Sequence, residues 1–115
     1  SFEACKSLAF MRVNPRFQED TYKLNMQKSA QFRALASELG TSASALAIAW
    51  LLSQGEHVVP IPGTRSVSHL DELVAGAGLS LSPTDLEAIE QALPVGWCFG
   101  DRYTEDQWRG PERYC

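Results

Sequence analysis

Apolar residues recur at helical spacing along the first half of the chain. The first helix is predicted to begin at Asp20, an N-cap residue type, and to stop at Gly40. Its apolar positions at i, i+3, i+4 and i+7 are Phe32, Leu35, Ala36 and Leu39. This spacing indicates a helix with one apolar face.

A second helix follows at once and is apolar on every side. Thr41 is its predicted N-cap, and Gly55 is its predicted stop. Between them stands the run Ala45-Leu46-Ala47-Ile48-Ala49-Trp50-Leu51-Leu52. A helix without a polar face is expected to be enclosed by the rest of the fold.

Two more helices are predicted further along. The third follows a glycine-led turn at residues 63–66 and ends at Gly76 and Gly78; its apolar stripe is Val67, Leu70, Leu73 and Val74. The fourth begins with Ser82 as N-cap and Pro83 at the first helical position, and Pro94 closes it.

One short strand is predicted at residues 58–62, Val-Val-Pro-Ile-Pro, between Gly55 and Gly63. Pro60 removes a donor from the ladder, so the strand is expected at an edge or paired on one side only. A lone strand needs a neighbour for its backbone groups. The chain therefore reads as part of a larger α/β fold, or as a chain whose strand pairs with another copy.

Three regions result, and the predicted fold class is mostly α with one short β-strand. Residues 1–19 are expected to be an irregular lead-in, and residues 20–94 a helix-helix-strand-helix-helix segment. Residues 95–115 form a C-terminal tail rich in aromatic and charged residues, which is expected to dock onto this chain or a partner.

Composition excludes several classes of protein. The 115 residues include 10 basic and 14 acidic side chains, for a net charge of −4, so nucleic acid is not an expected partner. No apolar run approaches the about 20 residues of a membrane span, so no membrane partner is expected. A closed (β/α)8 barrel needs about 250 residues, so a complete barrel is excluded.

The cysteines favour a reducing compartment. Cys5, Cys98 and Cys115 are odd in number and far apart, unlike a disulfide framework or the paired ligands of a zinc site. We therefore expect no metal and a cytoplasmic location.

Three motifs, in order, resemble the aldo-keto reductases. Residues 14–18 resemble the family's N-P-R-F-Q loop, and residues 41–55 resemble its T-x-x-x-x-A-L-A-W-L-L-x-x-G helix. Residues 59–65, with Leu70 and Glu72, are similar to its V-P-I-P-G-T-[KR]…L-x-E-N segment. The tail also looks like the C-terminus of some bacterial members. The resemblance implies the C-terminal part of a (β/α)8 barrel that reduces aldehydes and ketones with NADPH.

The resemblance also implies a cofactor site. In the family, the loop after the eighth strand and the start of the next helix hold the adenosine phosphate of NADP. The corresponding residues here are Gly63, Thr64, Arg65 and Ser66, with His69 and Glu72 on the facing side of the helix. The residue types agree independently, because a glycine, a helix N-terminus and an arginine together suit a phosphate.

Two departures limit what the resemblance implies. Leu73 stands where the family has the asparagine that contacts adenine, so that contact is not expected. The family's catalytic Asp, Tyr, Lys and His lie upstream of the residues matched here, and no catalytic residue is predicted; Tyr22, Tyr103 and Tyr114 match no such position, and His57 and His69 fit structural or surface roles.

Two functions remain open. The chain is either the part of an NADP-dependent carbonyl oxidoreductase that carries some of its cofactor site and is inactive alone, or a non-catalytic helical module that self-associates. In both cases we expect a homo-oligomer, most simply a dimer, because the apolar helix and strand lack covering neighbours.

Overall fold

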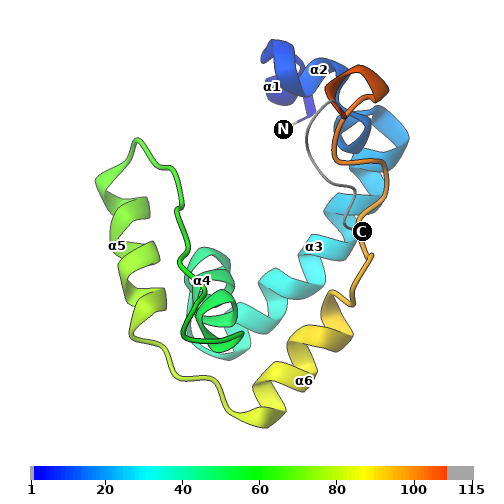
Figure 1. Ribbon diagram of the computed structural model, residues 1–115. Coiled ribbons are helices and arrows are strands. Elements are labelled where there is room, and N and C mark those ends of the chain that lie inside the picture. The colour runs from blue at the N-terminus through cyan, green and yellow to red at the C-terminus, as the bar shows by residue number, and fades with distance from the viewer. Residues whose placement is uncertain (1, 109–115) are drawn as a thin grey trace. The chain divides into compact units, whose positions relative to one another are not determined.

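The structure is a computed structural model that describes residues 2–108 (Figure 1). Its elements are α1 (Phe2–Lys6), α2 (Ala9–Val13), η1 (Pro15–Phe17), α3 (Glu19–Glu38), α4 (Ala43–Ser53), α5 (Val67–Ala77), α6 (Pro83–Ala92) and η2 (Glu105–Gln107). The described residues form two compact units, residues 31–92 and residues 2–30 with 93–108.

Residues 31–92 enclose a small hydrophobic core. The buried side chains at its centre are Ala36 on α3, Leu46 on α4 and Ile89 on α6. Leu46 is fully buried. Partly buried residues pack around them: Phe32, Leu35, Leu39, Ala43, Trp50, Leu79 and Leu81. The apolar spacing predicted for α3 therefore does face this core.

α4 and α5 approach closely at Gly76. A Cβ atom added to this buried glycine would lie 2.5 Å from the carbonyl oxygen of Ala45 and 2.9 Å from Cβ of Ile48. Gly76 therefore lies inside α5, where its lack of a side chain admits the neighbouring helix, rather than ending the helix as predicted. Gly78 is the C-cap.

Serines cap the helices of this unit. The side chain of Ser42 accepts a hydrogen bond from the backbone N–H of Ala45 at 3.1 Å, so α4 is capped one residue later than predicted. At α6, Ser82 accepts from the N–H of Asp85 at 3.2 Å, and Asp85 accepts from the N–H of Ser82 at 2.8 Å. This reciprocal pair is a capping box, and α6 begins at Pro83 as predicted.

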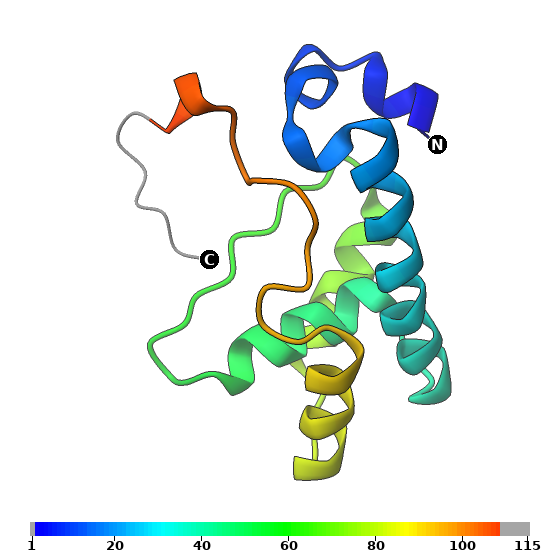
Figure 2. The same ribbon diagram turned by 90° about the vertical axis from the view of Figure 1, so that its right-hand side faces the viewer.

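The predicted strand at residues 58–62 is absent. Within residues 2–108 no strand is present, and Figures 1 and 2 both draw the connection from α4 to α5 as a loop. The prediction failed because a strand exists only when a neighbour accepts and donates its ladder hydrogen bonds, and residues 2–108 supply none. The fold is therefore mostly helical.

The predicted irregular lead-in is also wrong, because α1, α2 and η1 occupy it. Asn14 organises the turn into η1: its side chain accepts from the N–H of Arg16 at 2.9 Å. The amide of Gln18 then donates to the carbonyl oxygens of Arg12 and Asn14, at 3.1 and 2.9 Å. Side-chain caps thus support helical turns too short to show an apolar period.

The described part of the tail lies against the lead-in and the first turns of α3. The amide of Asn14 donates to the carbonyl oxygen of Arg102 at 2.8 Å, and the side chain of Asn25 bonds both backbone groups of Phe99, at 2.8 and 2.9 Å. Gly100, with a φ of 84°, lets the two backbones meet, because an added Cβ would lie 2.6 Å from the carbonyl oxygen of Pro15. The rest of the predicted tail, residues 109–115, lies outside the described residues.

No single helix within residues 2–108 has the length and hydropathy needed to cross a membrane; α3 and α4 pass that test only together, as a bent pair.

Candidate functional site

The loop before α5 folds back on itself through side-chain hydrogen bonds. The hydroxyl of Thr64 accepts from the backbone N–H of Ser66 at 3.2 Å. Ser66 is the N-cap of α5, and its hydroxyl accepts from the N–H of His69 at 3.5 Å. Threonine and serine favour such local turns and caps, so this short sequence specifies its own geometry.

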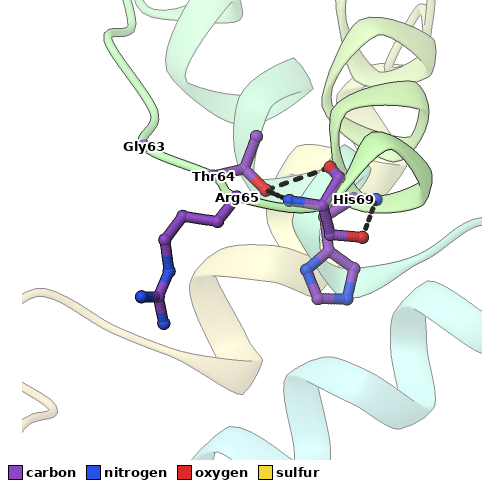
Figure 3. Close-up of a pocket in the computed structure, with 5 residues that line it drawn as sticks. Gly63, Thr64, Arg65 and His69 are labelled. Carbon is purple, nitrogen blue, oxygen red and sulfur yellow. Dashed lines mark hydrogen bonds between the residues drawn. The ribbon is translucent and has the colours of Figure 1, made fainter.

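This loop and the first turn of α5 line an open surface pocket of about 600 Å³ (Figure 3). Its lining residues are Gly63, Thr64, Arg65, Ser66 and His69. Figure 3 shows the Arg65 side chain extending away from the hydrogen-bonded group of Thr64 and His69, with its guanidinium exposed. The pocket thus combines a reachable positive charge with the start of a helix.

The structure brings together five of the six residues predicted for the site. Glu72 is not among the lining residues; it lies one turn further along α5 and is half-buried.

The start of α5 is electropositive. The Ser66 hydroxyl accepts a hydrogen bond from the backbone N–H of His69. The N–H groups of Val67 and Ser68 have no hydrogen-bond partner within the described part of the chain. The first turn carries no acidic residue. Unpaired N–H groups and the helix dipole attract an anion, and Arg65 adds a full positive charge with several donors. The site is therefore suited to a phosphate or a similar anion.

The other residues considered for chemistry lie elsewhere. His57 is exposed and lies against Gly55, where an added Cβ would come within 2.7 Å of its ring. The Tyr22 ring packs against the Phe2 ring in a tilted arrangement, with centroids 5.2 Å apart and an interplanar angle of 38°. Among residues 2–108, no group of three or more His, Cys, Asp or Glu side chains is placed to hold a metal ion.

Two adjoining pockets in the other unit were not anticipated. One of about 490 Å³ is lined by Arg16, Val95, Gly96, Trp97, Cys98, Gly100 and Asp101. The other, of about 200 Å³, is mainly apolar and shares Arg16, Trp97 and Cys98 with the first. The two segments that line these pockets, a proline-arginine loop and the aromatic tail, are both visible in the sequence. They are about eighty positions apart, so only the tertiary fold brings them together.

The comparison with protein families agrees with the motifs. Residues 4–94 match the family model described as "Aldo/keto reductase family". The chain therefore belongs to the aldo/keto reductases, and the resemblance inferred from its sequence is confirmed.

Two curated relatives extend the comparison. The chain is 38% identical over 93 residues to Probable aldo-keto reductase 1 of Glycine max, covering 81% of this chain and 27% of that protein. It is 31% identical over 94 residues to Aldo-keto reductase yakc [NADP(+)] of Schizosaccharomyces pombe, covering 82% of this chain and 28% of that protein. The chain thus spans just over a quarter of the length of these relatives. No solved structure gives a significant match.

Proposed function

We propose that residues 63–69 form part of the NADP(H) site of an aldo/keto reductase and bind the adenosine phosphate of the cofactor. The observation that carries the proposal is the pocket itself, in which Arg65 and the capped start of α5 come together. One relative is named with NADP(+), which supports the choice of cofactor. The chain would then correspond to the C-terminal part of the family's barrel.

The residues present fit the phosphate end of this cofactor. Gly63 has open space around its Cα, so a ligand can approach the backbone there. The exposed guanidinium of Arg65 can bond two phosphate oxygens at once, and the N–H groups of Val67 and Ser68 can bond a third. When bound, the nicotinamide end of the cofactor supplies or accepts a hydride.

The position that contacts adenine in the family holds a different residue type in this chain. Leu73, which replaces the family's asparagine, is half-buried and lines an apolar groove with Ile48 and Leu52. This side chain packs within its own unit and offers no hydrogen bond to a base. We therefore propose that this chain binds the cofactor through its phosphate and contributes little adenine selectivity.

The proposed role of the chain is to bind the cofactor and not to catalyse. No residue of this chain matches the family's catalytic positions, and the chain spans just over a quarter of its relatives. Carbonyl reduction would need the remainder of such a protein. The widely spaced cysteines favour the cytoplasm as its location.

The proposal is tested with adenosine 2′,5′-bisphosphate followed by amide NMR. We expect shifts centred on residues 63–69, weaker with adenosine 5′-monophosphate, and binding weakened about tenfold or more in Arg65→Ala, since a charge-assisted hydrogen bond contributes roughly 1.5–3 kcal/mol. Arg12→Ala, which removes an exposed arginine of α2, is the matched control. If Arg65→Ala and Arg12→Ala leave the same shifts, the loop is not the anion site.

The second candidate function is a non-catalytic module that self-associates. It is favoured by one observation, the exposed apolar residues Val59 and Ile61 between α4 and α5.

A further inference from the structure

The pocket at the start of α5 combines a permanent positive charge with one that depends on pH. Arg65 and His69 both line this pocket, and Figure 3 shows their side chains extending to the same side of the loop. A guanidinium is charged at every physiological pH. An imidazole gains or loses its charge between about pH 5 and pH 8. The positive charge that the pocket offers to a ligand therefore changes within the physiological range.

Local hydrogen bonding fixes His69 at the pocket. His69 lies in the first turn of α5, and its backbone N–H donates to the hydroxyl of Ser66 at 3.5 Å. This cap uses the backbone of His69 and leaves the exposed imidazole available to a ligand. The position of the ring follows from a helix cap and one helical turn, so it does not depend on a distant segment of the protein.

The other charged groups near His69 lie outside the pocket lining. Among the described residues, no carboxylate lines the pocket, and none forms an ion pair with His69. α4, which packs against α5, carries no charged residue. Besides Arg65 and His69, the charged or titratable residues of α5 and of the loop packed against it are Glu56, His57, Asp71 and Glu72. An anion in the pocket therefore meets Arg65 and His69 as the charged groups of its lining.

A phosphate monoester is the anion that gains most from a second positive charge. Above its second pKa of about 6, a monoester carries close to two negative charges. The 2′-phosphate of NADP(H) is such a monoester, and NAD(H) lacks it. A charge on His69 therefore acts on the group that distinguishes these two cofactors.

We propose that His69 makes the binding of the cofactor's 2′-phosphate dependent on pH, because its protonated imidazole adds a charged donor to that of Arg65. The proposal rests on the cofactor site proposed above. Affinity for a 2′-phosphorylated ligand falls as pH rises and the imidazole loses its proton. His69 thus sets how strongly this site prefers a 2′-phosphorylated ligand at a given pH.

The first test follows the imidazole C–H signals by NMR during a pH titration, with and without adenosine 2′,5′-bisphosphate. The chain has two histidines, so His57, outside the pocket lining, is an internal reference. We expect the ligand to move the titration midpoint of His69 upward by about half a pH unit, since an exposed ion pair contributes modestly. The midpoint of His57 should not move. Equal midpoints of His69 with and without the bound ligand would overturn the proposal.

The second test measures the affinity for inorganic sulfate, which remains a dianion throughout, so that any change with pH comes from the protein. The affinity of the unchanged chain should fall about three- to fivefold from about pH 5.5 to about pH 8.5. His69→Gln should bind with little change over this range, and the matched control His57→Gln should follow the unchanged chain. His69→Arg should bind as tightly at the high pH as the unchanged chain does at the low pH, a rescue that a merely structural role would not give.

Two results separate the failure of this proposal from the failure of the cofactor site. If the anions shift the amide signals of residues 63–69, but His69→Gln and His57→Gln have the same pH profile, the site stands and the role of His69 is wrong. If neither anion shifts these signals at any pH, both proposals are overturned.

Discussion

Asn14 is a polar residue that is almost completely buried, with 3% of its surface exposed. Its oxygen accepts from the N–H of Arg16, and its amide donates to the carbonyl oxygen of Arg102. Buried polar groups are costly unless they are bonded in this way. The Asn14 side chain therefore both caps the start of η1 and binds the backbone at Arg102, 88 positions away in sequence.

Asp85 makes the stability of α6 dependent on pH. The Ser82 hydroxyl, at 2.7 Å, and then the Ser82 backbone N–H, at 2.8 Å, lower the pKa of the Asp85 carboxyl below its ordinary value. Because the folded pKa is lowered, this cap stabilises the helix above the ordinary aspartate pKa of about 3.9, and the contribution is lost as pH falls through the lowered value.

We therefore expect Ser82→Ala to raise the pKa of Asp85 toward the ordinary value, because both the hydroxyl bond and the capping geometry are weakened. A carboxyl titration followed by NMR measures this directly. Ser80→Ala, an exposed serine just before the cap, is the control and should leave Asp85 unchanged. Identical Asp85 titrations in the two variants would show that the cap does not set this pKa.

At the scale of the elements, the α4–α5 contact depends on a single missing side chain. Gly76→Ala would gain up to about 1 kcal/mol in helix propensity, but its Cβ would overlap the backbone of α4 at Ala45. Because the overlap is with backbone atoms, overpacking should cost about 3 kcal/mol, the upper end of its usual range, so we expect a net loss of about 2 kcal/mol in the free energy of unfolding. Urea unfolding followed by far-UV circular dichroism measures it.

Gly78→Ala is the matched control for this substitution. Gly78 has a φ of −94°, and an added Cβ would meet its closest atom, the carbonyl oxygen of Ala75, at 3.7 Å, an ordinary contact. The variant should be neutral or slightly stabilised. If both alanine variants unfold at the same urea concentration, the close approach at Gly76 does not limit the packing of α5.

The sequence predicted the elements whose signals are local. The apolar spacing of α3 and the run in α4 gave both helices, and Ser82-Pro83 gave the start of α6. The prediction of a strand at residues 58–62 was wrong because a strand forms only when a neighbour pairs with it, and a local sequence pattern does not show whether that neighbour is present. The sequence did not predict α1 and α2, because five-residue helices are too short to display a periodic pattern of apolar residues. The prediction that Gly76 ends α5 was wrong because the sequence does not distinguish a glycine that ends a helix from one that lets a neighbouring helix approach closely.

The candidate site was predictable for a related reason. Four of its five lining residues are consecutive, and the fifth follows within the same helical turn. The pockets around Arg16 and Trp97 join segments that are distant in sequence, so nothing local marked them. That Glu72 lies outside the lining could not be foreseen, since the direction of the loop relative to α5 decides which side of the helix faces the pocket.

At the scale of the whole molecule, we expect this chain alone to reduce no carbonyl compound. General acid catalysis and correct placement of a hydride each contribute several orders of magnitude, and the proposed site binds only the phosphate end of a cofactor. NADPH oxidation with a panel of aldehydes should equal the protein-free rate, with a full-length active family member as the positive control. Oxidation that persists through repurification would contradict this expectation.

The unit formed by residues 2–30 and 93–108 is discontinuous in sequence, and this sets the order in which the molecule can assemble during synthesis. Asn14 and Asn25 leave the ribosome long before Phe99 and Arg102, the residues whose backbone they bind. Residues 31–92 are continuous, and domains generally fold as units as the chain emerges. Asn14 and Asn25 therefore gain these backbone partners only after Phe99 and Arg102 have been synthesised, when the central helices can already have formed.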